Sequence, residues 1–114
     1  MWLFTTSGFI SIVEKDADHL VVRARDCLSL SPLAQSYDVE IRSTPAADYP
    51  YRIFITKNQL KNWLSNQPGQ IQYKNFKSQV SITRGKKFSD ALLKVWSAMH
   101  LVEDKAARSK DENR

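Results

Sequence analysis

An alternating stretch at residues 2–25 constrains the fold of this 114-residue chain more than any other part of the sequence. Two runs rich in β-branched and aromatic residues, 2–6 and 9–13, are joined by a Ser-Gly pair and form the first arm of a predicted hairpin. After a charged turn, residues 19–25 return as the second arm. A chain that begins in this way must build an antiparallel sheet.

The two arms divide their side chains between two faces, because successive residues of a strand point to opposite sides. The apolar face contains Ile10, Ile12, Leu20, Val22 and Ala24. The other face contains Phe9, Ser11, Val13, His19, Val21, Arg23 and Arg25. We expect later elements to cover the apolar face.

The rest of the chain supplies two more strands and four helices. Alternation predicts strands at 39–43 and 51–55, separated by a loop with two prolines. A short helix is expected at about 30–36; Asp26 is one candidate cap, but a start at Ser31 places Pro32 at the first helical position. The predicted fold is therefore α+β, a two-layer sandwich with an antiparallel sheet of about four strands and helices packed on one face, in the order β-β-α-β-β-α-α-α.

Three of the predicted helices follow the last strand. Thr56 and Gln59 match a capping box and start a helix that runs to about residue 66. A short helix is predicted at 73–80, and a longer one at 86–102. The apolar stripe of the last helix is expected to pack on the sheet and contains Phe88, Ala91, Leu92, Val95, Trp96, Met99 and Val102.

The bulk properties fit one globular domain over residues 1–102, with a charged tail predicted at 103–114. The single cysteine, Cys27, is expected to be a small buried residue, and it favours a reducing, cytoplasmic setting. No secretory signal or membrane-length apolar run is visible. His19, His100 and Cys27 fall on three separate elements, and no metal, cofactor or Gly-rich phosphate motif is present. We therefore predict a protein that is not an enzyme.

The formal net charge of +5 is concentrated in residues 69–100, which carry six cations against Asp90 alone. Such a segment points to an anionic partner, here a nucleic acid or a ribonucleoprotein. The candidate binding residues are Tyr73, Lys74, Lys77, Arg84, Lys86, Lys87 and Lys94, expected to form one patch where the last two helices meet. In the alternative interpretation Tyr73 and Phe76 belong to the core and the lysines are a solvated helix face. A second function class is a protein-interaction factor of the inhibitor, accessory, anti-defence or immunity type, with no nucleic acid involved.

Four arginines on the predicted strands, Arg23, Arg25, Arg42 and Arg52, offer another basic surface. Cross-strand pairing with Glu14 and Glu40 is the first interpretation. If the guanidinium groups are unpaired, an open face with Arg and Tyr suits an RNA backbone or an acidic protein. The aromatic loop at 48–52 is either a recognition loop or a proline-fixed entry into a strand with one Tyr packed on the sheet.

Several separated blocks of the sequence share a pattern with known proteins. They are 1–9, 21–25, 47–52 and 73–77, the last reading Tyr-Lys-Asn-Phe-Lys. Together they resemble a family of small uncharacterised bacterial proteins, expected in cyanobacteria and proteobacteria. The resemblance implies no activity. Family members follow the last block with a Gly-His-rich segment, whereas this chain has residues 85–89 without histidine.

Overall fold

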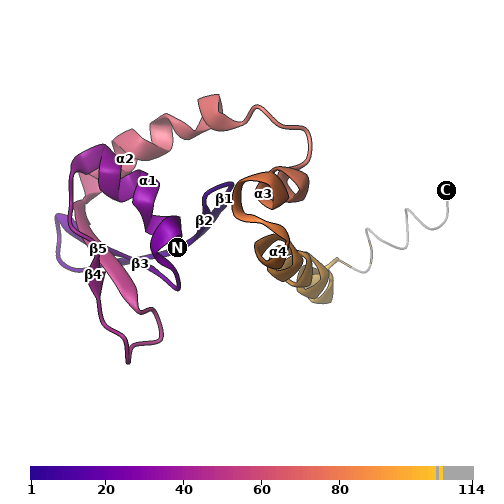
Figure 1. Cartoon of the computed structure of the whole chain (residues 1–114), viewed down its shortest axis with the longest axis horizontal. Helices are drawn as coiled ribbons and strands as arrows, with labels where there is room; N and C mark the ends of the chain where they lie inside the picture. Colours follow the sequence, from indigo (N-terminus) through magenta and orange to yellow (C-terminus); the bar gives the residue numbers. More distant parts are fainter. Residues whose placement is uncertain (105, 107–114) are drawn as a thin grey trace.

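The computed structural model describes residues 1–104 and 106, and these form a five-stranded antiparallel sheet with four α-helices (Figure 1). The strand order is β1-β2-β3-β5-β4. The predicted α+β class is confirmed. The strands are β1 (Trp2–Thr5), β2 (Gly8–Glu14), β3 (His19–Ala24), β4 (Arg42–Ser43) and β5 (Tyr51–Thr56). The helices are α1 (Cys27–Tyr37), α2 (Lys57–Ser65), α3 (Phe76–Arg84) and α4 (Lys86–Ala98), with short 3-10 turns η1 (Gln67–Gln70) and η2 (Met99–Val102).

The sheet has five strands because the predicted first arm is itself a hairpin. Thr5 pairs with Gly8, so the chain reverses between β1 and β2. Gly8 has a φ of 144°, which a residue without Cβ adopts readily. At the other edge, β4 is shorter than the predicted strand 39–43, since Val39 and Ile41 pack against the core instead.

The core lies between one face of the sheet and helices α1 and α2. The apolar face predicted from the alternation is buried, and its partners include Leu30 and Leu33 of α1 and Leu60 of α2. The capping box of α2 is present as predicted, with Thr56 and Gln59 each bonded to the other's backbone.

Helix α1 begins earlier than the predicted start at Ser31. Asp26 is its N-cap and accepts a hydrogen bond from the backbone N–H of Ser29, while Pro32 lies inside the helix. The cap and the burial of Leu30 and Leu33 against the sheet offset the hydrogen bond that Pro32 cannot make.

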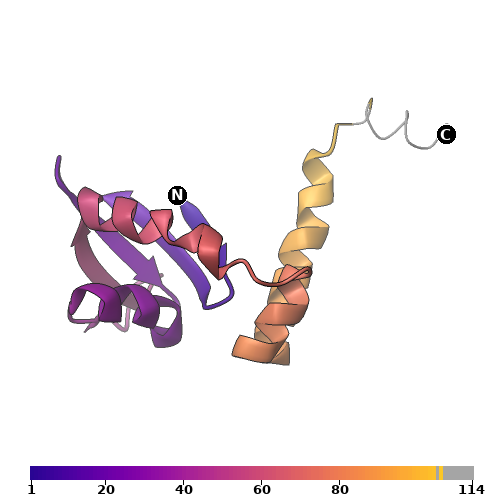
Figure 2. The ribbon, with the colours of Figure 1, turned by 90° about the horizontal axis from the view of Figure 1, so that it is seen from above.

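The prediction that the last helix packs on the sheet is wrong. Helices α3 and α4 form a hairpin beside the β1 edge, and α4 runs past the sheet toward its uncovered side (Figures 1 and 2). Trp96, Val95 and Met99 are exposed at 64%, 40% and 58%. The physical reason is that α1 and α2 already occupy the apolar face of the sheet. The predicted tail at 103–114 lies, apart from residues 103, 104 and 106, outside the described residues.

Candidate functional site

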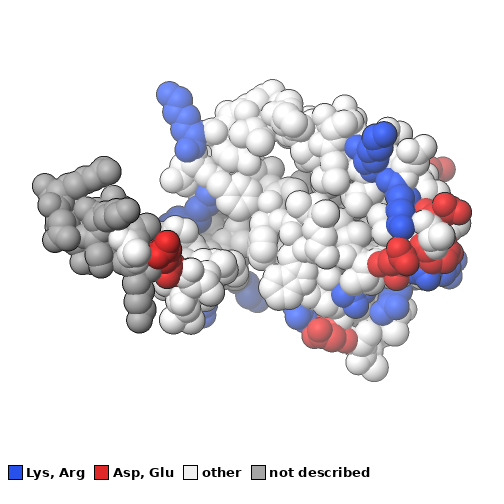
Figure 3. All heavy atoms as spheres, turned by 180° about the vertical axis from the view of Figure 1, so that it is seen from behind, with Lys and Arg blue, Asp and Glu red and all other residues white. Residues whose placement is uncertain are grey.

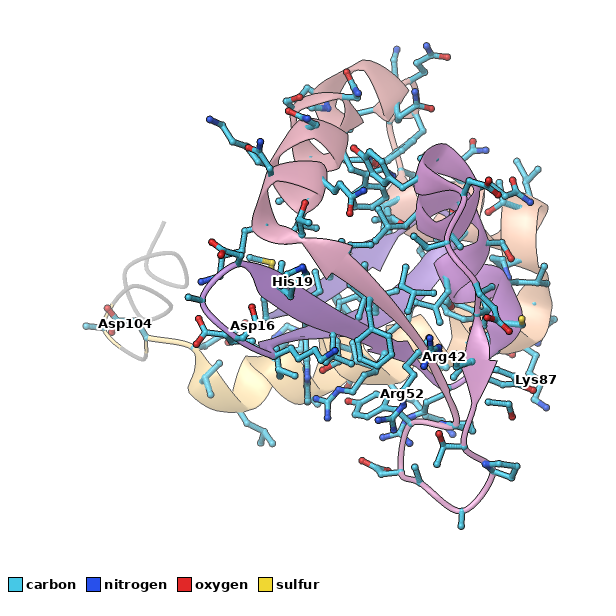
Figure 4. The ribbon with its side chains drawn as sticks, turned by 90° about the vertical axis from the view of Figure 1, so that its left-hand side faces the viewer. Asp16, His19, Arg42, Arg52, Lys87 and Asp104 are labelled. Carbon is cyan, nitrogen blue, oxygen red and sulfur yellow. The ribbon has the colours of Figure 1, made fainter. Side chains whose placement is uncertain are left out.

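The face of the sheet that no helix covers carries a row of three arginines. Arg23 on β3 lies directly opposite Arg52 on β5, and Arg52 lies directly opposite Arg42 on β4. The same row continues through Ser11 on β2 to Trp2 on β1. We call Arg23, Arg52 and Arg42 the arginine row. Figure 4 shows Arg42 and Arg52 next to each other near one end of the sheet.

Nothing in the described part of the chain neutralises the arginine row. Arg23 donates from Nη2 to Ser11 Oγ at 2.9 Å and stacks 4.7 Å above the Tyr49 ring, while Arg42 lies 5.3 Å above Phe54. The Nε atoms of Arg23 and Arg52 are buried and have no hydrogen-bond partner. No ion pair joins any of the three to an acidic side chain among residues 1–104 and 106.

The acidic residues predicted to pair with these arginines are placed elsewhere. Glu14 pairs with Lys57 at 2.8 Å, and Glu40 makes no ion pair within the described ranges. The cross-strand pairing of Glu14 and Glu40 with the strand arginines is therefore wrong. Of the four arginines predicted on strands, Arg25 lies just after β3 and is the only one with an acidic partner among the described residues, Asp48 at 2.9 Å, which raises the pKa of the guanidinium.

An apolar groove lies between the uncovered sheet face and helix α4. Its volume is about 760 Å³, and it adjoins a second hollow of about 540 Å³ toward α3. Figure 3 shows a broad uncharged area on this side of the molecule, with Lys and Arg atoms around it. The apolar side chains that line the first groove are Trp2, Phe4, Phe9, Tyr49, Phe88, Ala91, Leu92 and Val95.

The polar end of this groove is closed by Arg84, the last residue of α3. Its guanidinium donates to the carbonyl of Ser7, to Ser29 Oγ at 3.3 Å and to the carboxylate of Asp26, and it lies 4.5 Å above the Phe88 ring. Only 11% of the Arg84 side chain is exposed. Arg84 was predicted to belong to a basic surface patch, but its charge is neutralised and it fastens the α3–α4 hairpin to the sheet.

Asp26 has a lowered pKa in this environment. Partial burial by itself raises the pKa, but hydrogen bonds from Ser29 and Arg84 and the charge of Arg84 outweigh it. Asp26 therefore stays ionised at neutral pH, as its partner requires.

The other predicted site residues differ in their surroundings, and their grouping into one patch stays a prediction. Lys86 pairs with Asp90 at 2.9 Å, which raises the pKa of the lysine. Tyr73 is half-buried, with its ring centroid 5.9 Å from that of Phe76. Lys87 lines the groove and Lys77 lines the second hollow. Among these predicted residues, the exposed lysines without an ion pair to any described residue are Lys74, Lys77, Lys87 and Lys94.

The remaining chemical candidates lie apart. His19 and Asp16 share a turn, where Asp16 Oδ1 accepts from His19 Nδ1 at 2.8 Å and its pKa is lowered by this bond. His100 lies in η2 beside Glu103. Cys27 is exposed at the first position of α1, so the prediction that it is buried is wrong. Among the described residues, no three His, Cys, Asp or Glu side chains gather as metal ligands, and no helix has the length and apolarity of a membrane span.

The aromatic loop is a strand entry rather than an open recognition loop. Tyr49 is 8% exposed and is held between Arg23 and Arg25, with centroid distances of 4.7 and 4.6 Å. It also lies 6.3 Å from the Phe9 ring. Tyr49 therefore packs on the uncovered sheet face, and the Arg23 and Arg25 guanidinium groups stack on its ring.

The row and the groove were not visible in the sequence. The spacing of Arg23 and Arg25 showed that they share a face, but the strand order that places Arg52 and Arg42 beside Arg23 has no local signal. No protein-family model matches the chain, and comparisons with curated proteins and with solved structures give no match. The resemblance to small bacterial proteins stays a prediction.

Proposed function

We propose that this protein is a non-enzymatic binding protein that holds a single-stranded nucleic acid across the uncovered face of its sheet. The observation that supports the proposal is the arginine row, three cations opposite one another on neighbouring strands with no acidic partner among the described residues. Like charges in directly opposite positions destabilise a sheet. A bound anion reduces the repulsion between the arginines, and this relief favours binding.

The chemistry of the row suits phosphate. A guanidinium presents a planar fork of donors that binds phosphate oxygens in pairs, and buried donors without partners are rare in folded proteins. Two of the three arginines have a buried Nε of this kind. Because both Nε atoms are buried, a phosphodiester backbone lying along the row would bind the exposed parts of these guanidinium groups and the exposed Arg42.

The aromatic residues beside the row suit unpaired bases. Trp2 lies in the same row at the β1 edge and is 67% exposed, and the Phe4 and Phe9 rings stack behind it with centroids 4.7 Å apart. Proteins that bind single strands combine a cationic track with aromatic rings on which bases stack. The exposed lysines of residues 69–100 add long-range attraction to the same partner.

Fluorescence anisotropy with labelled single-stranded DNA and RNA tests the proposal. Neutralising about three phosphates predicts a slope of log affinity against log salt near −2, which is a loss of about 20-fold between about 50 and 200 mM salt. Changing the arginine row to Gln should remove most of that slope. Changing it to Lys keeps the charge but not the fork, and should weaken binding by an intermediate amount.

A matched control separates the row from net charge. The triple change Lys74→Gln, Lys77→Gln and Lys94→Gln removes the same formal charge from the helices. We expect this variant to bind more tightly than the arginine-row variant and to keep the salt slope. Absence of binding at about 50 mM salt, where electrostatic affinity is high, or equal losses in the two triple variants, contradicts the proposal.

A further inference from the structure

Helix α4 and the turn η2 carry an apolar stripe that remains largely exposed, although Val95 and Trp96 also line the two hollows beside the helix. Val95, Trp96, Met99 and Val102 form this α4 stripe, with exposures of 40%, 64%, 58% and 72%. Their spacing places them on one side of the helix. Monomeric proteins rarely leave so large a contiguous apolar surface in water, and such surfaces mark interfaces.

The groove between α4 and the sheet presents a second apolar surface. Its walls are Trp2, Phe4 and Phe9 on one side and Phe88 and Leu92 on the other. Phe88, Leu92 and Val95 of α4 line this groove, and the exposed Met99 and Val102 follow in η2. Figure 2 shows α4 running past the sheet. The stripe of one molecule can be buried in the groove of a second molecule of the same kind.

We propose that the occupant of the groove is a second copy of this chain. Two α4 helices pack antiparallel about a two-fold axis at Val95, and each places its α4 stripe in the groove of the other. An isologous interface of this kind requires a surface that complements itself after the rotation. The sequence of α4 meets that requirement in both shape and charge.

The apolar side chains are arranged symmetrically around Val95. Phe88 and Val102 lie equally far from it along the chain, as do Ala91 and Met99. In the antiparallel pair Phe88 therefore faces the other copy's valine and Met99 faces its alanine, while Trp96 comes beside the other copy's Lys94. Alternating large and small residues is how helix ridges fit into grooves.

The charges are also complementary in this register. The N-terminal end of α4 carries Lys86 and Lys87, and the segment after η2 carries Glu103 and Asp104. Lys87 and Glu103 are the same number of residues from Val95, so the lysine of one copy lies toward the glutamate of the other, which also bonds His100 of its own chain. Helix dipoles that run antiparallel add to the attraction. A parallel arrangement brings like charges together instead.

A disulfide across the two-fold axis tests the register. In a Cys27→Ser background, Val95→Cys places two thiols face to face at the axis, and mild oxidation should give a covalent dimer. Ile82→Cys, an exposed position on α3 that lines neither hollow, is the matched control and should stay monomeric. A covalent dimer from Ile82→Cys with none from Val95→Cys overturns the proposed register.

Sedimentation of the full chain tests the association itself. We expect a concentration-dependent dimer, and Trp96→Glu should raise its Kd by about 30-fold or more, as for a buried aromatic at the centre of an interface. Ile82→Glu adds the same charge to an exposed apolar residue and should leave the Kd unchanged. A chain that remains monomeric at every concentration, or a Trp96→Glu variant that dimerises like the wild type, refutes the second copy as occupant.

Charge reversal tests the complementarity separately. Lys87→Glu and Glu103→Lys should each weaken the dimer, and the double variant should recover it, since the opposite charges then meet again. Additive weakening in the double variant contradicts the antiparallel pairing. Trp2, Phe4 and Phe9 are also the rings proposed to stack bases, so a second copy and a bound strand compete for them. The dimer is therefore measured without nucleic acid, and its failure leaves the binding test of the arginine row unaffected.

Discussion

Replacement of Arg84 by Met tests how the α3–α4 hairpin is attached to the sheet. Met keeps an unbranched apolar side chain but removes the guanidinium, which links the hairpin to Ser7 in the β1–β2 turn and to Asp26 and Ser29 at the start of α1. We expect two of these contacts to contribute most to the free energy of unfolding. The bond to the Ser7 carbonyl has a charged donor, and the pair with Asp26 joins opposite charges.

The expected loss in the free energy of unfolding is about 2–3 kcal/mol. Hydrogen bonds to charged groups contribute roughly 1.5–3 kcal/mol each, and breaking a fully buried ion pair costs about 3–5 kcal/mol. The Asp26 side chain is 40% exposed, so water replaces part of what Arg84 provides and the cost falls below the buried limit. Asp26 also keeps its capping bond with Ser29.

The same variant changes how stability depends on pH. The folded-state pKa of Asp26 is lowered, so its contribution is present at neutral pH and is lost as the pH falls through the acidic range below about 4. Without Arg84 the pKa of Asp26 moves back toward its ordinary value. The wild type should therefore lose more stability than Arg84→Met between neutral pH and about pH 3.

Urea unfolding followed by circular dichroism measures both effects, and hydrogen exchange locates them. Protection in α3 and α4 should fall more than protection in the sheet, because the lost contacts join these two parts. Lys61→Met is the control, since it also introduces Met at an exposed lysine, here on α2 and outside the hairpin. A change below about 0.5 kcal/mol, typical of ordinary surface positions, or an equal loss in the control, would refute the assigned role of Arg84.

Two further predictions concern single side chains. Trp96→Ala should change the free energy of unfolding of the dilute monomer by less than about 0.5 kcal/mol, because Trp96 is largely exposed, whereas Leu30→Ala should cost about 2–5 kcal/mol; a large cost for Trp96→Ala would mean that its ring is buried in the monomer. Gly8→Ala should cost at least about 2 kcal/mol by thermal unfolding, because φ is +144° and an added Cβ lies 2.1 Å from Ser29 Oγ and 2.6 Å from Arg84 Nη1. An unchanged melting temperature would show that this turn is not packed as described.

Local patterns in the sequence determined most of the secondary structure. The alternation in residues 2–25 fixed which side chains of β2 and β3 face the core, because the two-residue period of a strand needs no tertiary information. Thr56 and Gln59 located the start of α2 for the same reason, since both partners of a capping box lie within one turn. The order α1, β4, β5, α2, α3 and α4 also follows from the chain alone.

Long-range packing decided the strand order and the position of α4. Both the arginine row and the exposed α4 stripe depend on it. The amphipathic pattern of α4 required a covering surface for its apolar stripe but could not say which one. Helices α1 and α2 occupy the apolar face of the sheet, so the stripe of α4 stays largely exposed. The arginine row exists only because β5 lies between β3 and β4, a pairing of segments far apart in the chain. Strand order depends on which segments bury the most apolar surface together, and no local signal in the sequence records that choice.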